Sequence, residues 1–99
     1  MIAIIDYGVG NLFSLASSLK SLGLETKVTR DAAAIRAADH IILPGVGAFA
    51  DAMAKLEATG LVPVIKQEVE HKPLLGICLG MQLLFEKSYE YGEHTGLGL

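Results

Sequence analysis

The chain has a single cysteine among its 99 residues, so it cannot form an internal disulfide bond. One free thiol fits a reducing compartment, and we therefore expect a cytoplasmic protein. No apolar run approaches the roughly 18–20 residues that a membrane-spanning helix needs. The N-terminus also lacks a charged region followed by an apolar stretch and a cleavage site. The sequence thus predicts neither a membrane segment nor a secretory signal.

Basic residues are few and scattered along the chain. Lys and Arg number 8 against 11 Asp and Glu, which gives a net charge of −3 at pH 7. Because there is no basic cluster, we expect no nucleic-acid partner. The sequence shows no internal repeat, linker or low-complexity segment, and its length allows one small domain.

Apolar residues, in contrast, are abundant: 52% of the chain is hydrophobic, and the mean hydropathy is +0.46. A domain of this size has a large surface relative to its core, so that many apolar side chains are hard to bury. We therefore expect an exposed apolar face or edge that further protein would cover. The closing residues 96–99, Gly-Leu-Gly-Leu, are typical of the start of a strand, and we interpret the chain as a truncated domain.

Short apolar runs alternate with segments of helical periodicity. The pattern predicts strands at 2–5, 25–29, 40–43 and 73–77, and helices at 12–22, 32–38, 48–57, 62–70 and 80–87. This alternation favours right-handed βαβ units and a parallel sheet, and the uniformly apolar strands indicate that both faces are covered. We therefore predict an α/β fold of the flavodoxin-like type, with helices on both faces of the sheet.

Three glycine-rich loops directly follow predicted strands. They are Asp-Tyr-Gly-Val-Gly-Asn at 6–11, Pro-Gly-Val-Gly at 44–47 and Gly-Ile-Cys-Leu-Gly at 76–80. The carboxyl ends of parallel strands meet at one edge of the sheet, and ligands bind there. Each loop alone could be ordinary turn chemistry, but three at the same edge indicate a site where backbone approaches a ligand closely.

The third loop places Cys78 between Gly76 and Gly80, which matches the small-x-nucleophile-x-small pattern of a nucleophile elbow. In such a tight turn only residues without bulky side chains fit at the flanking positions. The central residue is strained, its side chain projects into the site, and the N-terminus of the next helix favours a thiolate. The alternative is an ordinary buried cysteine.

The loop at 44–47 is a candidate oxyanion site. Acyl transfer builds negative charge on a carbonyl oxygen, and backbone N–H groups that point at this oxygen stabilise the charge. The candidate donors are the amides near Val46 and Gly47, together with the amide of Leu79 in the elbow. The alternative is a plain turn after a strand.

A nucleophilic cysteine also needs a base, which is usually a histidine oriented by a carboxylate. His40 opens a predicted strand at the edge opposite the glycine loops, His71 ends a helix, and His94 lies in a glycine-rich stretch. None of them has the context of a base, so we interpret all three as surface or structural histidines.

The motifs Asp-Tyr-Gly-Val-Gly-Asn, Pro-Gly-Val-Gly-Ala-Phe and Gly-Ile-Cys-Leu-Gly-Met-Gln, in this order and spacing, closely resemble those of the class I (triad) glutamine amidotransferases. The first two motifs are most similar to the glutaminase subunits of histidine biosynthesis. The resemblance covers the whole chain, but family members are much longer and carry their catalytic His and Glu in a downstream H-x-E segment. It therefore implies that residues 1–99 are the N-terminal half of a single class I glutaminase domain.

The resemblance also implies residue roles. Cys78 would attack the carboxamide carbon of glutamine. Gly45, Val46, Gly47 and Leu79 would form the oxyanion site, which in this family needs a peptide rotation before it can donate. Met81, Gln82 and Glu90 would bind the substrate, and Tyr7 and Asn11 would lie toward the partner and the ammonia exit. The simpler alternatives are a polar helix residue for Gln82, a surface carboxylate for Glu90 and an N-cap for Asn11.

The implied partner is a (β/α)₈-barrel cyclase, which forms a heterodimer with the glutaminase and receives its ammonia. The resemblance implies no metal and no organic cofactor. Because the base is missing, we expect little or no glutaminase activity from these residues alone. Two alternatives remain: another class I glutaminase, feeding anthranilate or carbamoyl phosphate synthesis, and a non-catalytic flavodoxin-like module that binds a small anion.

Overall fold

The computed structural model describes residues 1–90 and 92–99, and its elements follow the predicted order. The strands of the main sheet are β1 (Ile2–Ile5), β2 (Thr26–Thr29), β3 (His40–Leu43) and β4 (Leu74–Gly76). The helices are α1 (Leu12–Ser21), α2 (Ala32–Ala37), α3 (Phe49–Ala58), α4 (Val62–Glu68) and α5 (Leu79–Leu83). None of the helices in the described residues is long and apolar enough to span a membrane.

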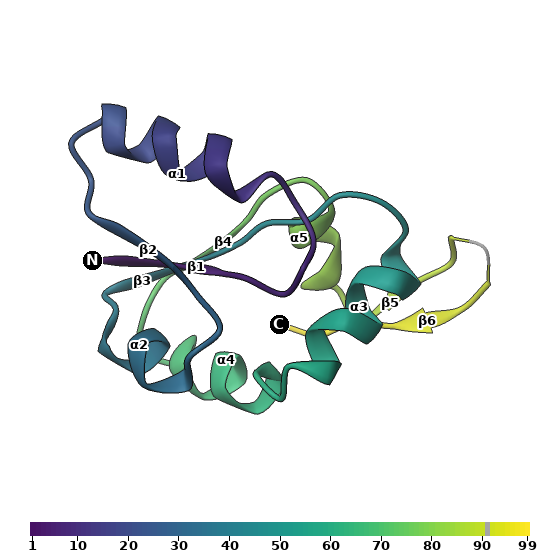
Figure 1. Ribbon diagram of the computed structural model, residues 1–99. Helices are drawn as coiled ribbons and strands as arrows, with labels where there is room; N and C mark the ends of the chain where they lie inside the picture. Colours follow the sequence, from purple (N-terminus) through teal and green to yellow (C-terminus); the bar gives the residue numbers. More distant parts are fainter. Residues whose placement is uncertain (91) are drawn as a thin grey trace.

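The four strands are parallel and lie in the order β2-β1-β3-β4. α1 lies on one side of the sheet, whereas α2 and α4 lie on the other (Figure 1). This is the flavodoxin-like strand order, in which the chain changes direction across the sheet between β1 and β3, and ligands bind beyond the carboxyl ends at this point. The predicted fold class is therefore confirmed. The first two glycine loops follow β1 and β3, so the topology brings them to this crevice.

Residues adjacent to the helices set several of the helix boundaries. The Asn11 side chain accepts a hydrogen bond from the Ser14 amide at 3.1 Å and caps α1, and Asp31 caps α2 through the Ala33 amide at 3.1 Å. After α1, Gly23 adopts a φ of 80°, which is the left-handed conformation common just beyond a helix end. These caps fix where the first loop joins its helix.

The core lies between the sheet and the layer of α2, α3 and α4. Alternate strand residues point into it, and they pack with fully buried side chains of these helices. The strand contribution comes from Ala3, Ile5, Ile41 and Leu43, and the helices add Ile35, Phe49, Leu56 and Ile65. Phe49 directly follows the loop at 44–48, so the core holds one end of this loop in place.

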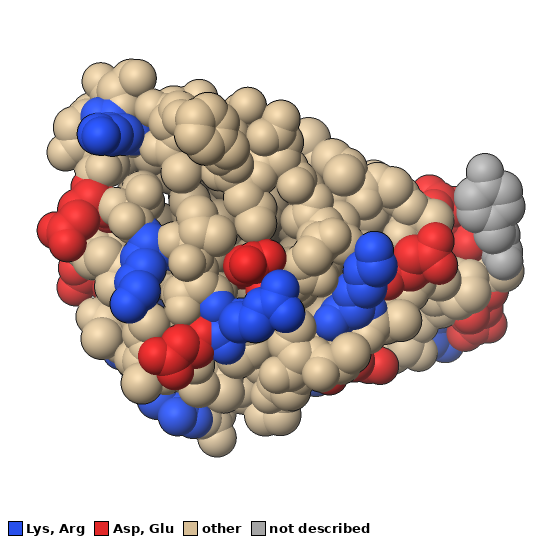
Figure 2. All heavy atoms as spheres, in the orientation of Figure 1, with Lys and Arg blue, Asp and Glu red and all other residues tan. Residues whose placement is uncertain are grey.

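The opposite face of the sheet is only partly covered. Val28, Ile4, Ile42 and Leu75 form a row in register across the four strands on the side of α1. None of the ten residues of α1, all of them described, is buried, and Leu75 on the edge strand β4 is 57% exposed. Figure 2 shows the surface over α1 as mostly uncharged, with charges of both signs interspersed below it. The central members of this row, Ile4 and Ile42, are buried, whereas the outer members Val28 and Leu75 are 39% and 57% exposed, so the predicted exposed apolar surface is confirmed at the edges of the sheet.

Two predictions for the C-terminal segment are wrong. The helix predicted over 80–87 ends at Leu83, and residues 96–99 do not form a strand. Instead, four consecutive amides donate to the carbonyls of the last residue of α5 and of the three residues that follow it: Gly96 to Glu86 at 2.8 Å, Leu97 to Leu83 at 2.8 Å, Gly98 to Phe85 at 3.1 Å and Leu99 to Leu84 at 2.7 Å. A helix end leaves such carbonyls unpaired, so this segment acts as a backbone cap. Between α5 and this segment, β5 (Lys87–Ser88) and β6 (His94–Thr95) pair as an antiparallel hairpin, which the sequence pattern does not predict.

Candidate active site

Cys78 stands at the sharp turn between β4 and α5. Its φ of 53° and ψ of −122° make it the only residue other than glycine with positive φ in the described part of the chain. A residue with a Cβ adopts this region at a cost of about 1–2 kcal/mol. The cysteine is exposed to solvent. The alternative of a buried cysteine is therefore wrong, and the predicted strained, projecting conformation is confirmed.

The glycines on either side of Cys78 are sterically required. A Cβ at Gly76 would lie 2.6 Å from the Cα of Met81. A Cβ at Gly80 would overlap the carbonyl oxygen of Leu43 and lie 2.7 Å from its carbonyl carbon. Both contacts are with backbone atoms, which cannot move aside as the end of a flexible side chain can. The turn is thus as tight as the sequence pattern predicts, because its backbone packs directly on the end of β3.

The candidate oxyanion loop, predicted at 44–47 and joined to α3 through Ala48, lies against this elbow. The carbonyl oxygen of Gly45 accepts a hydrogen bond from the amide of Leu79 at 3.2 Å. Among the described residues, the amides of Val46 and Gly47 have no protein acceptor, and Val46 is 59% exposed. In this conformation the Leu79 amide, which is a predicted oxyanion donor, therefore already donates its hydrogen bond to the Gly45 carbonyl of the loop. Rotation of the Gly45–Val46 peptide would withdraw this carbonyl and turn the Val46 amide toward the elbow.

Tyr7 holds the start of the oxyanion loop. Its side chain is buried, with 3% exposed, and its hydroxyl donates a hydrogen bond to the carbonyl of Pro44. Burial raises the pKa of Tyr7 to about 12, so the phenol stays protonated and able to donate. A Cβ on Gly45 would lie 2.7 Å from this hydroxyl and 2.7 Å from the Gly80 amide. The side chain predicted to lie toward a partner is thus placed inside, where it contacts the oxyanion loop.

A cavity of about 170 Å³ beside Cys78 joins the three glycine loops. It is lined by Gly10, Asn11, Leu15, Pro44, Gly45, Val46, Ile77 and Cys78. The first loop packs closely on the second, since a Cβ on Gly10 would lie 3.3 Å from the Cβ of Pro44. The predicted convergence of the loops at one edge is confirmed. Asn11 both caps α1 and lines this cavity.

The three residues predicted to bind substrate do not line this cavity. Met81 and Gln82 lie on α5 immediately after the elbow, and both are exposed. Glu90 lies in the turn between β5 and β6, and its Oε1 accepts a hydrogen bond from the amide of Phe49 at 3.2 Å. The structure therefore places Glu90 at the far end of the oxyanion loop.

No histidine in the described residues lines the Cys78 cavity. His40 begins β3 at the opposite edge of the sheet, and the Nε2 of His71 lies 3.6 Å from the carboxylate of Glu68. His94 lies in β6 and lines a hollow beside α3. The described residues also contain no group of three or more side chains suited to hold a metal ion. The site thus has a nucleophile and candidate oxyanion donors without an adjacent base.

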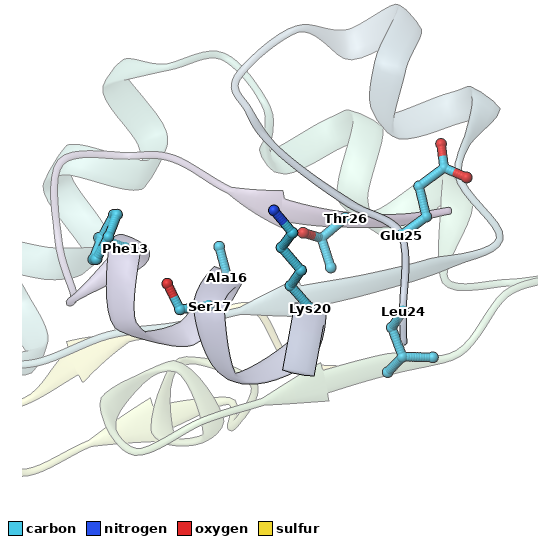
Figure 3. A pocket seen from close by; sticks show the side chains of 7 residues that line it. All are labelled: Phe13, Ala16, Ser17, Lys20, Leu24, Glu25 and Thr26. Atoms are coloured by element: carbon cyan, nitrogen blue, oxygen red, sulfur yellow. The ribbon is translucent and has the colours of Figure 1, made fainter. Parts of the chain in front are cut away.

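A larger hollow of about 490 Å³ lies between α1 and β2 (Figure 3). It is lined by Phe13, Ala16, Ser17, Lys20, Leu24, Glu25 and Thr26. Its lining includes one residue of each charge and no residue of the three glycine loops. Because of this lining, we do not interpret the hollow as a catalytic site although it is larger. The candidate catalytic groups lie at the elbow instead.

Together, the parallel sheet, the exposed cysteine between two sterically required glycines and the adjacent glycine loop are typical of an enzyme that transfers acyl groups through a nucleophile elbow. Comparison with known proteins defines the family. The family model "Glutamine amidotransferase class-I" matches residues 3–95, and the chain belongs to this family.

Curated relatives match almost the whole chain. The imidazole glycerol phosphate synthase subunit HisH of Aquifex aeolicus is 56% identical over 98 residues, and that of Exiguobacterium sibiricum is 54% identical over 99. These alignments cover 97% and 100% of the chain but 47% and 51% of the relatives, so the chain spans about half of their length. A solved structure described as "Crystal structure of glutamine amidotransferase" matches the whole chain and 53% of its own, with a TM-score of 0.81 at 24% identity, and supports the fold.

Proposed function

We propose that residues 1–99 form the N-terminal, nucleophile-bearing half of a single glutaminase domain, the glutaminase subunit of imidazole glycerol phosphate synthase in cytoplasmic histidine biosynthesis. The observation that carries this proposal is the exposed, strained Cys78 beside the loop at 44–48. The two HisH relatives, at 54–56% identity over nearly the whole chain, support this subfamily over other class I glutaminases.

In the proposed reaction, the thiolate of Cys78 attacks the carboxamide carbon of glutamine. The carbonyl oxygen gains negative charge, which the amides of Leu79 and Val46 stabilise once the Gly45 carbonyl has turned away. The C–N bond breaks, the nitrogen takes a proton and leaves as ammonia, and a glutamyl thioester remains. Water then attacks this thioester, the C–S bond breaks, and glutamate and the free thiol are released.

The remaining roles follow from the same assignment. Gln82, the backbone of Met81 and Glu90 hold the substrate, while Asn11 lies toward the partner and the ammonia exit. The partner is a (β/α)₈-barrel cyclase, which forms a heterodimer with the glutaminase and consumes the ammonia. The described residues place no base at the sulfur, so the histidine and its carboxylate belong to a longer polypeptide of the length of the relatives. No metal or organic cofactor has a part in this mechanism.

A chimaera tests the proposed function. This chain replaces the aligned half of the Aquifex aeolicus HisH subunit, and glutamate formation is measured with the cyclase of that organism and its nucleotide substrate. We expect turnover by the chimaera and none above buffer by the 99 residues alone. Cys78→Ser in the chimaera lowers turnover by about a thousandfold or more, because it removes the nucleophile.

Two results would contradict this proposal. One is a folded chimaera that binds the cyclase but forms no glutamate. The other is turnover that survives Cys78→Ser. The cyclase is the control for specificity, since a glutaminase of another pathway would not respond to its nucleotide substrate.

A further inference from the structure

Side chains hold the oxyanion loop at both of its ends. At the start, the Tyr7 hydroxyl donates to the carbonyl of Pro44. At the end, the Glu90 carboxylate accepts from the amide of Phe49, the first residue of α3. Between these two points lies the Gly45–Val46 peptide, which would have to rotate for the Val46 and Leu79 amides to donate. The two fixed ends therefore confine the movement to the middle of the loop.

Glu90 provides α3 with a hydrogen-bond acceptor at its N-terminus, which the residue at the N-cap position does not. The residue at the N-cap of α3 is Ala48, whose methyl side chain cannot accept a hydrogen bond. The first amides of a helix have no partner within the helix, and a carboxylate is the favoured group near this positive end. Because Phe49 is fully buried, its amide also defines where the loop enters the core.

The β5–β6 hairpin places Glu90 at this helix end. Figure 1 shows the hairpin beside α3, and residues of both elements line a common hollow. The Glu90 amide donates to the hydroxyl of Ser88 at 3.2 Å. An ion pair of 2.8 Å between Lys87 and Glu93 links the two sides of the hairpin. Contacts made by residues before and after Glu90 in the sequence therefore fix the position of its carboxylate.

We propose that Glu90, which the proposed function already makes a substrate ligand, is also a positioning residue of the oxyanion loop. Its Oε1 fixes the Phe49 amide at the end of the loop, and its Oε2, which has no protein partner among the described residues, takes the α-ammonium group of the substrate. The second half of this statement rests on the proposed function. The single carboxylate of Glu90 would then contact both the α-ammonium group of the substrate and the end of the loop that stabilises the oxyanion.

Two matched probes separate the two roles. The first is the chloromethyl ketone of the glutamine side chain, 2-amino-6-chloro-5-oxohexanoic acid, and the second is the same ketone without the α-amino group. In both, a bond forms between the Cys78 sulfur and the methylene carbon, chloride leaves, and the thiol proton passes to solvent. The ketone oxygen beside the reacting carbon lies where the oxyanion would form, so the rate at saturation reports on the loop.

The variants Glu90→Ala and Glu90→Gln are compared with the parent chain. Glutamine keeps an oxygen that accepts from Phe49 but loses the charge that pairs with an ammonium group. With the amine-free probe we therefore expect Glu90→Gln to react at the parent rate and Glu90→Ala about fivefold more slowly, the ratio typical of a lost helix-capping hydrogen bond. Both variants lose the parent's preference for the amino probe. Amide hydrogen exchange at Phe49 is faster in Glu90→Ala only.

A second change distinguishes positioning from general stability. Ala48→Ser in the Glu90→Ala background provides an ordinary N-cap, which accepts from amides further into α3 and not from Phe49. We expect the double variant to regain the free energy of unfolding of the parent while its rate with the amine-free probe stays low.

Each outcome of these measurements has a defined meaning. Equal rates of Glu90→Ala and Glu90→Gln with the amine-free probe overturn the positioning role, whatever the amino probe shows. Recovery of the rate together with stability in the double variant also overturns it, because Glu90 would then only stabilise the helix. A parent chain with no preference for the amino probe contradicts the proposed glutamine site and the substrate half of this inference, and leaves the amine-free comparison to decide the positioning half.

Discussion

Replacing Gly80 by alanine is expected to lower the free energy of unfolding by about 3–5 kcal/mol, which is among the largest effects of a single substitution. The added methyl group would overlap the carbonyl oxygen of Leu43 and lie 2.9 Å from the carbonyl carbon of Pro44. Both are backbone atoms in the centre of the fold, so relief requires that the elbow separate from the end of β3. The measurement is urea unfolding followed by far-ultraviolet circular dichroism.

Gly60→Ala is the matched control for this substitution. Gly60 has a φ of 74° and open space where a Cβ would lie, so an alanine there is strained but not crowded. We expect a loss of about 1 kcal/mol from the backbone conformation alone. If Gly80→Ala cost no more than Gly60→Ala, the elbow would have room for a side chain, and the steric account of the exposed cysteine would fail.

Replacing Cys78 by glycine is expected to stabilise the fold while it removes the reactive thiol completely. The φ of 53° and ψ of −122° strain any residue with a Cβ but not glycine. Because Cys78 is exposed, its side chain contributes little packing that could be lost. We therefore expect Cys78→Gly to be more stable than Cys78→Ala by about 1–2 kcal/mol.

The comparison with Cys78→Ala is essential, because both variants lack the sulfur and differ only in the methyl group. Unfolding midpoints of the two variants in urea give the difference directly. A Cys78→Gly variant less stable than Cys78→Ala would show that the turn is relaxed. The idea that this fold stores strain at its nucleophile would then be wrong.

The sequence allowed prediction of those features that depend on neighbours along the chain. Asn11 and Asp31 cap helices through amides two or three residues away, and their positions mark these helix starts without any tertiary information. The elbow is predictable for the same reason. The spacing of Gly76, Cys78 and Gly80 between an apolar strand and a helix predicts a turn with no room for a side chain at Gly76 or Gly80, and the structure shows this.

Contacts between distant segments were not predictable from such patterns. The Tyr7 hydroxyl meets Pro44 across 37 residues, and Glu90 meets Phe49 across 41. Residues 96–99 resemble a strand in sequence, but their amides donate to carbonyls at and just after the end of α5. The hydrogen bond from the Leu79 amide to the Gly45 carbonyl could not be predicted from the residues either, because glycine allows its peptide either orientation; only the resemblance implied that this loop needs a peptide rotation.

The central claim is that the Cys78 sulfur and the Leu79 amide act on the same carbonyl group. The most direct measurement is a crystal structure of the protein alkylated by the amino chloromethyl ketone. The account predicts that the sulfur carries the adduct, that its ketone oxygen accepts a hydrogen bond from Leu79, and that the Gly45 carbonyl has left this amide. An adduct whose ketone oxygen points into solvent, with the Gly45–Leu79 hydrogen bond intact, would contradict it.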